Sequence, residues 1–275
     1  MSKAIELDDD GFIKVENKFN YKSFDVKSKS KQRRKGKKKY FFKDCNDWDL
    51  NDLKTTLAQR KEALLESRFY SDLMEILNQS LLPREPQDIV CYGIGSMQKS
   101  KNAQYQFILA LVIRDLLKIP GRMSIYDPVM TELDKEICQF HDIDVIAINE
   151  DGKRSVTKPT LFYMPHCGRG LYSNTLSSNW NPTQLTHTTI LGNRFDMYVG
   201  SQLDKDLKRE CPYLIPAVKI VEAVPFPPKF DNNQIFNDLS IQWFPQDKMS
   251  AVEKTFWDVI STEDLAPMDA DTLRS

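Results

Sequence analysis

The chain has 275 residues, 41% of them hydrophobic, and a formal net charge of −1. This length suits one large domain with tails or two small domains, and the near-zero charge gives no overall argument for binding nucleic acid or a membrane. The chain contains neither an apolar run long enough to span a membrane nor an apolar leader, so we expect no membrane partner and no signal peptide. Its five widely spaced cysteines, without a CxxC pair, are typical of a reduced intracellular protein.

Residues 1–44 are polar and charged without a sustained hydrophobic period, which predicts a disordered basic tail. Within it, Lys27–Lys39 (KSKSKQRRKGKKK) contains no acid. Such a run is typical of a nuclear-localisation or polyanion-binding segment, although a solvated tail without a partner has the same composition. We therefore expect a cytoplasmic and nuclear protein that contacts nucleic acid directly through residues 27–39 or not at all.

The next segments follow a helical and then an alternating pattern. Residues 45–87 are predicted to form a helical lead-in, because leucines recur at helical spacing until Pro83. Five apolar runs beyond it predict strands at Asp88–Tyr92, Met123–Tyr126, Asp144–Asn149, Thr160–Met164 and Thr188–Leu191. Three intervening patterns predict helices at Asn102–Lys118, Thr131–Phe140 and Leu171–Ser178.

This alternation predicts a single α/β domain over residues 88–246, with a Rossmann-like, mainly parallel sheet flanked by helices. Leu214–Val224 and Leu239–Phe244 are predicted as two further strands, which could form an antiparallel pair at one sheet edge. Residues 247–275 are predicted to hold a weak helix near Val252–Ile260 and then a polar tail.

In an open parallel sheet the ligand crevice lies at the carboxyl ends of the strands. Gly93 and Gly95 follow the first strand, and glycine there lets the backbone approach a ligand closely. Ser96 completes the turn, but Gln98 stands where the dinucleotide fingerprint has a third glycine. The segment is therefore either an anion- or nucleotide-binding turn or a tight connection between strand and helix.

Three other strand ends carry polar side chains. Asp127 is a candidate for binding a ribose hydroxyl, or a turn aspartate before Pro128. His166 and Cys167 are candidate catalytic residues as general base and nucleophile, although a polar turn that closes the sheet is the simpler interpretation. The one His–Cys pair is too small a ligand set for zinc, so we expect no metal site. Two more candidate ligand-binding residues are Arg169 and Asn193.

Six strings in this region resemble the SRR domain, the Sensitivity-to-Red-light-Reduced family. They are Cys-Tyr-Gly-Ile-Gly-Ser (91–96), Tyr-Asp-Pro-Val (126–129), Tyr-Met-Pro-His-Cys (163–167), Leu-Tyr-Ser-Asn (171–174), Asn-Trp (179–180) and Leu-Gly-Asn (191–193). Family members often have serine after Leu-Gly-Asn, where this chain has Arg194.

The resemblance implies a regulatory protein that acts in circadian clock input and clock-gene expression, with haem biosynthesis as a second process. It implies protein partners that it does not identify, and neither a catalytic activity nor a cofactor. The alternative, from the residues themselves, is a nucleotide- or S-adenosylmethionine-binding enzyme with its site at the strand ends.

Overall fold

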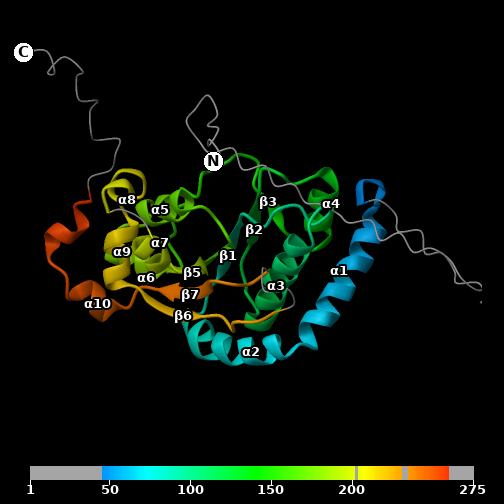
Figure 1. Ribbon diagram of the computed structural model, residues 1–275, viewed down its shortest axis with the longest axis horizontal. Coiled ribbons are helices and arrows are strands. Elements are labelled where there is room, and N and C mark those ends of the chain that lie inside the picture. Colours follow the sequence, from blue (N-terminus) through cyan, green and yellow to red (C-terminus); the bar gives the residue numbers. More distant parts are fainter. Residues whose placement is uncertain (1–44, 202–203, 231–234, 260–275) are drawn as a thin grey trace, which may run out of the picture. The chain divides into compact units, whose positions relative to one another are not determined.

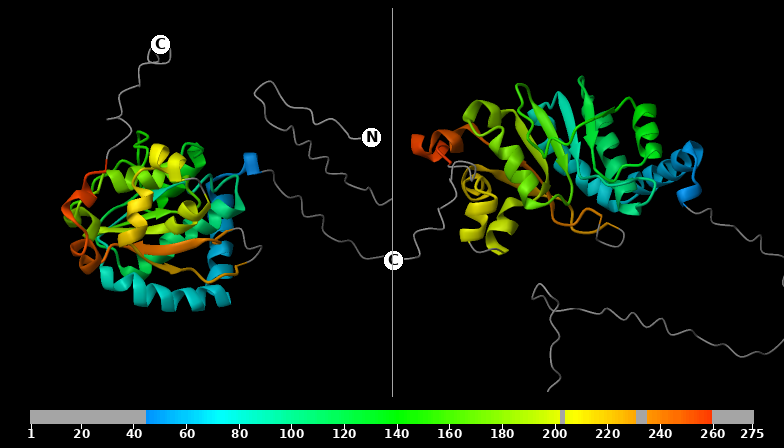
Figure 2. Two further views of the ribbon diagram at one scale, coloured as in Figure 1. Left: turned by 60° about the vertical axis from the view of Figure 1, so that its left-hand side comes forward. Right: turned by 90° about the horizontal axis from the view of Figure 1, so that it is seen from above.

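The computed structural model describes residues 45–201, 204–230 and 235–259. The predicted tail at 1–44, with its basic run, and residues 260–275, which include the predicted polar tail, lie outside them. The described chain forms one seven-stranded sheet in the order β3-β2-β1-β4-β5-β7-β6, with helices on both faces (Figure 1; Figure 2, right). The predicted α/β class and the mainly parallel sheet are therefore confirmed.

The strands are β1 (Asp88–Tyr92), β2 (Met123–Tyr126), β3 (Asp144–Val145), β4 (Thr160–Met164), β5 (Thr188–Asn193), β6 (Glu222–Pro225) and β7 (Leu239–Trp243). The neighbours from β3 to β5 pair in parallel, for example Val90 with Phe162. Strand β7 is antiparallel to both β5 and β6, which confirms an antiparallel pair at the β6 edge.

Ten α-helices are assigned among the described residues: α1 (Leu50–Leu65), α2 (Arg68–Ser80), α3 (Lys101–Leu117), α4 (Glu132–Phe140), α5 (Arg169–Ser177), α6 (Pro182–Thr186), α7 (Phe195–Ser201), α8 (Asp204–Glu210), α9 (Leu214–Ile220) and α10 (Gln246–Ser250). Side chains of Asp49, Ser67, Ser100 and Thr131 accept hydrogen bonds from the first turns of α1, α2, α3 and α4, which fixes where these helices begin. No described helix is long and apolar enough to cross a membrane.

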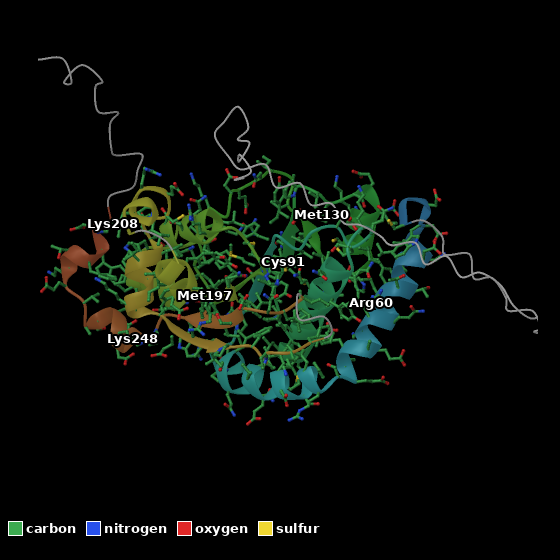
Figure 3. All side chains as sticks on the ribbon, in the orientation of Figure 1. Arg60, Cys91, Met130, Met197, Lys208 and Lys248 are labelled. Carbon is green, nitrogen blue, oxygen red and sulfur yellow. The ribbon has the colours of Figure 1, made fainter. Side chains whose placement is uncertain are left out.

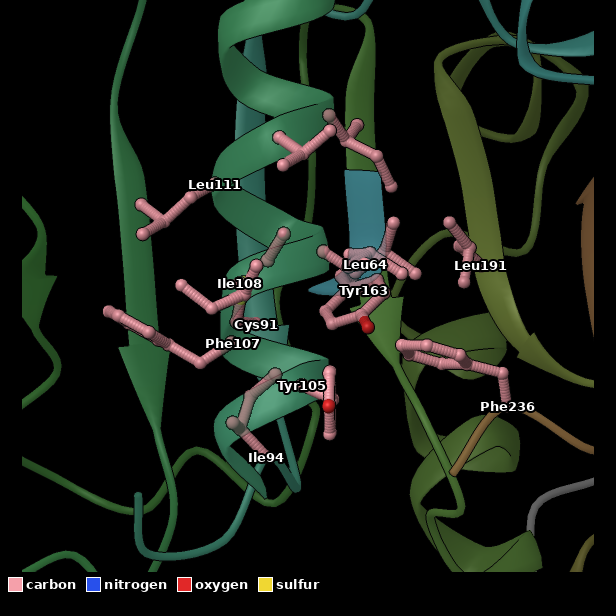
Figure 4. Packing of buried hydrophobic residues seen from close by; sticks show 14 of the residues in the cluster. Leu64, Cys91, Ile94, Tyr105, Phe107, Ile108, Leu111, Tyr163, Leu191 and Phe236 are labelled. Atoms are coloured by element: carbon pink, nitrogen blue, oxygen red, sulfur yellow. The ribbon is translucent and has the colours of Figure 1, made fainter. Parts of the chain in front are cut away.

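The sheet separates two buried clusters. Alternate strand residues such as Cys91 and Tyr163 face α1 to α4 in the larger cluster, shown in Figure 4. Val90 and Phe162 point to the other face, where they pack with α5, α6, α7 and α9. Because the central strands are buried on both faces, their sequences are continuous apolar runs without alternating polar residues.

Three sequence predictions differ from the structure. Leu214–Val224 was predicted as one strand, but it is helix α9 followed by the short strand β6. Strand β3 ends at Val145 instead of Asn149, and the chain then runs to β4 without a helix. Of the helix predicted near Val252–Ile260, the described residues 252–259 form a 3₁₀ turn at Lys254–Trp257 instead, and Ile260 lies outside the described residues.

Candidate functional site

In a doubly wound sheet the ligand crevice lies at the switch point, where the strand order reverses direction. In this sheet the switch point is between β1 and β4. The carboxyl ends of these strands bring the glycine turn next to the His166–Cys167 turn. The ends of β2 and β5 add Asp127 and Asn193 on either side. All but one of the predicted site residues thus gather along one edge of the sheet; the exception is Arg169.

The glycine turn is held by side chains of the neighbouring segment. Gly93 and Gly95 have positive φ values of 72° and 83°, a conformation that glycine adopts without strain. The Gly95 amide donates to Asp127 Oδ2 at 2.8 Å, and the Gln98 amide donates to Asp134 Oδ1 at 2.8 Å. Buried Ser96 accepts a hydrogen bond from the Lys99 amide at 3.3 Å. Much of the turn's polar capacity is therefore used within the protein.

Cys167 fills the switch point. A Cβ atom placed on Gly93 would lie 2.5 Å from Cys167 Sγ, so the thiol occupies the space that the glycine leaves. The thiol donates to the Tyr92 carbonyl oxygen at 3.4 Å. Burial, and then the nearby negative charge of Asp127, raise the pKa of Cys167 to about 12. A protonated, buried thiol is a poor nucleophile, so this geometry favours a structural role for Cys167.

We expect iodoacetamide to modify Cys167 very slowly in the folded protein at pH 8. With a pKa of about 12 only ~10⁻⁴ of this thiol is ionised, against ~20% of an ordinary thiol. Raising the pH towards 9 ionises ordinary cysteines but leaves Cys167 protonated, because its pKa lies well above that range. Peptide mass spectrometry over time should find partly exposed Cys45 modified first, and Cys167 only after unfolding in urea. Rapid native labelling of Cys167 would instead support a nucleophile.

His166 and Asn193 are directly connected. His166 has a φ of +55°, and its amide donates to Asn193 Oδ1 at 2.9 Å. The His166 Nε2 atom lies 3.0 Å from the Ile235 carbonyl oxygen. Gln242 Nε2 donates to the Asn193 carbonyl oxygen at 3.1 Å. Asn193 therefore joins the ends of β4, β5 and β7, and the exposed imidazole of His166 is anchored at one nitrogen.

Arg169 is directed to a different partner. Its guanidinium pairs with Glu210 of α8, which also pairs with Arg209 at 2.8 Å. Hydrogen bonding to Glu210 raises the pKa of Arg169, so the side chain stays charged. The structure thus shows Arg169 as a link between α5 and α8.

Two tyrosines that organise this edge were not predicted as site residues. The Tyr172 hydroxyl donates to the Met164 carbonyl oxygen at 2.5 Å and accepts from the Asn193 amide at 2.9 Å, and the Tyr198 hydroxyl donates to the Cys167 carbonyl oxygen at 3.0 Å. Desolvation by burial raises the pKa of Tyr198 to about 12. Tyr172 was notable only as part of a family string, and Tyr198 lies on a helix that the sequence did not predict.

A second unpredicted group attaches the connection between β3 and β4 to β1. The Tyr92 hydroxyl donates to Glu150, and Arg154 donates to both oxygens of the same carboxylate at 2.9 and 2.6 Å. Burial works against the charged form of Glu150, but the hydrogen bonds from Arg154 and Tyr92 outweigh it and lower the pKa of this carboxyl. Glu150 therefore remains an anion shared by two donors.

An open cavity of about 460 Å³ lies at the carboxyl ends of β2 and β3. Its lining includes Tyr126, Asp127, Pro128, Lys135 and Ile146. Asp127 Oδ1 accepts from the Val129 amide at 2.9 Å, and each carboxylate oxygen retains capacity for a second donor. A carboxylate, an ammonium group and apolar walls suit a small polar ligand with a flat apolar part. In the described part of the chain, no cluster of three or more His, Cys, Asp or Glu residues is arranged to hold a metal ion.

Comparison with known proteins identifies relatives of this chain. The model of the SRR1 domain matches residues 61–243. An SRR1-like protein of Drosophila melanogaster is 28% identical over 78% of this chain and 76% of its own length. The Arabidopsis thaliana protein SENSITIVITY TO RED LIGHT REDUCED 1 is 31% identical over 55% of this chain and 62% of its own. A mouse SRR1-like protein is 35% identical over 46% of this chain and 51% of its own.

Two solved structures resemble the fold at low similarity. The 23S rRNA methyltransferase ErmE matches 74% of this chain and 72% of its own, at 14% identity and a TM-score of 0.36. The Podospora anserina methyltransferase PaMTH1 matches 69% of this chain and 87% of its own, at 11% identity and a TM-score of 0.38. The identity of the chain rests on the family match, which spans all strands from β1 to β7: this protein belongs to the SRR1 domain family.

Proposed function

We propose that this protein is an intracellular regulator that acts in circadian clock input through clock-gene expression, and also in haem biosynthesis. The observation that carries the proposal is membership of the SRR1 domain family, together with an Arabidopsis relative named for reduced sensitivity to red light. The strand-end geometry is compatible with a regulatory role. The Cys167 thiol is buried and protonated, and Asn193 joins three strands, so both residues have structural roles there.

The test is removal of the gene from cells that express it, followed by rescue with the full chain. We expect altered rhythms of clock-gene transcripts and altered total haem, both restored by the wild-type protein. Normal rhythms together with normal haem in the knockout would overturn the proposal. If one process changes and the other does not, the proposal is reduced to the process that changed.

A second candidate function is binding of a nucleotide-like ligand, including S-adenosylmethionine, in the cavity beside Asp127. Its support is the position of this cavity at the end of β2, where doubly wound folds carry an acid for ribose hydroxyls. In this arrangement Asp127 accepts from the hydroxyls, Lys135 faces a negatively charged group, and Tyr126 and Ile146 contact the base. A regulator with such a site would sense the ligand without transforming it.

We expect a thermal-shift screen of the full chain against ATP, NAD, NADP, S-adenosylmethionine and haem to find a ligand. At a ligand concentration of a hundred times the dissociation constant, binding adds about 2.7 kcal/mol to the free energy of unfolding. This raises the melting temperature by roughly 5–10 °C. Ala147→Trp should abolish the shift, because exposed Ala147 lines the cavity and the indole would fill it. Ile148→Trp is the matched control, since the neighbouring side chain is 75% exposed and outside the lining. No shift, or an equal shift in Ala147→Trp, contradicts this candidate.

A further inference from the structure

A second cavity, of about 330 Å³, lies among the helices and away from the strand ends. It is bounded by α1, α3 and the last turn of α4, three helices that lie together in Figure 1. Leu57 from α1 and Ile108 and Leu111 from α3 form its floor, and all three are buried. Ile108 and Leu111 project from the same side of α3 in Figure 4. The floor is therefore a continuous apolar surface fixed by two packed helices.

The wall at the end of α4 is aromatic. Phe140 is 55% exposed although its ring is large and apolar, and it lies at an angle to the His141 ring with the ring centres 5.0 Å apart. Arg114 Nη1 donates to the His141 carbonyl oxygen at 2.7 Å, which fixes this wall to α3. Burial, and then the positive charges of Arg114 and Lys61, lower the pKa of His141, so the imidazole is neutral at pH 7.

The rim of the cavity is positively charged. Lys54, Lys61 and Arg114 line it, with Asp115 as the one carboxylate among the lining residues. Asp115 is shared, because it lies 3.6 Å from Lys61 Nζ and 3.4 Å from Arg114 Nε. Lys54 has no carboxylate within ion-pair distance among the residues that the structure describes, and its Nζ lies 3.4 Å from the centre of the Phe140 ring. The rim thus has more positive than negative charge, directly above an apolar floor.

We propose that this cavity binds a small amphipathic anion, an aromatic or short-chain carboxylate. Its apolar body rests on Leu57, Ile108 and Leu111, and its carboxylate lies between the ammonium groups of Lys54 and Lys61. The cavity volume falls in the range of small-molecule sites, and an apolar floor below a rim with three cations and one carboxylate selects this class over neutral or cationic molecules. The site shares no residue with the cavity beside Asp127, so the two proposals succeed or fail separately.

The experiment is titration of the full chain with 1-naphthoate, followed by the fluorescence of the ligand and by calorimetry. The uncharged 1-naphthylmethanol, which has the same ring system, is titrated in parallel. We expect saturable binding of 1-naphthoate with one site per chain, and binding of the alcohol about tenfold weaker. Absence of saturable binding at millimolar naphthoate, or equal affinity for the two molecules, overturns the proposal.

Two variants locate the site. Ala58→Trp places an indole in the cavity from an exposed position of α1, so it should abolish binding. Circular dichroism should show that this variant remains folded. Lys54→Met keeps the length of the side chain but removes its charge, and should weaken naphthoate binding about three- to tenfold without changing the affinity for the alcohol. Lys208→Met is the control, because Lys208 is an exposed lysine of α8. Figure 3 shows it far from Arg60, which marks the position of α1 and therefore of the cavity. Full binding by folded Ala58→Trp, or equal losses in Lys54→Met and Lys208→Met, would contradict the site.

Discussion

Replacing Gly93 with alanine is expected to lower the free energy of unfolding by about 3 kcal/mol. The residue has a φ of +72°, which costs an L-residue roughly 1–2 kcal/mol. The new Cβ atom would also lie 2.5 Å from Cys167 Sγ, and relieving that overlap requires movement of the turn between β4 and α5. Urea unfolding followed by circular dichroism measures the effect.

The two causes can be separated by a second substitution. Cys167→Ala removes the sulfur atom, so the double variant with Gly93→Ala should regain the part of the loss that comes from overlap and keep the part that comes from φ. Gly168→Ala is the matched control, because Gly168 has a φ of −67° and nothing lies within 4 Å of its Cβ position. A Gly93→Ala protein as stable as Gly168→Ala would show that the thiol does not fill the switch point.

Asn179→Ala should be similarly damaging, with a loss of about 3 kcal/mol, because it leaves several buried polar groups without partners. Asn179 is fully buried, and its Oδ1 accepts from the Val156 amide at 2.9 Å. Its Nδ2 donates to the carbonyl oxygens of Arg154 and Thr175, both at 2.8 Å. This amide attaches the helix-free connection before β4 to helix α5. Hydrogen exchange of the Val156 amide should therefore accelerate together with the loss of stability.

Asn174→Ala is the control for this experiment. Asn174 lies on α5, just before the turn that holds Asn179, and makes one hydrogen bond to the same connection, from Nδ2 to the Asp151 carbonyl oxygen at 2.8 Å, but this bond is exposed. Water replaces such a bond, so the loss should stay below about 1 kcal/mol. Equal losses in the two variants would mean that burial of Asn179 does not determine its contribution.

The central strands were predictable because their sequence and their environment agree. Asp88–Tyr92 and Thr160–Met164 are apolar runs followed by turn residues, and both strands are found as predicted. The prediction failed at Leu214–Val224, where apolar residues fit a strand or a buried helix equally well. Leu214, Ala217 and Ile220 are the buried positions, which is helical spacing, and Pro216 lies in the first helical turn, where its missing amide hydrogen costs nothing.

At the candidate site the sequence predicted where the polar and glycine residues lie along the chain but not their partners. The polar and glycine residues predicted at the strand ends lie at the carboxyl ends of the strands, Asn193 as the last residue of β5. Their hydrogen bonds join residues distant in sequence, such as Asp127 to Gly95 and Asn193 to His166. Such pairs depend on strand order and on the rotation of each turn, neither of which a local pattern encodes. The same reason explains why Glu150 was not recognised as the partner of Tyr92.

The two ends of the sheet bear on whether copies of the protein can add to one another through their backbones. An exposed outer strand offers unpaired amide and carbonyl groups to another chain, and long flat ones promote aggregation. Here β3 has only two residues, and the carboxylate of its Asp144 lies 3.7 Å from Arg122. At the other end β6 has four residues, with Pro225 lacking an amide hydrogen and Glu222 pairing with Lys248. Both outer strands of the described sheet are therefore short and carry a charge or a proline, features that disfavour backbone pairing between copies.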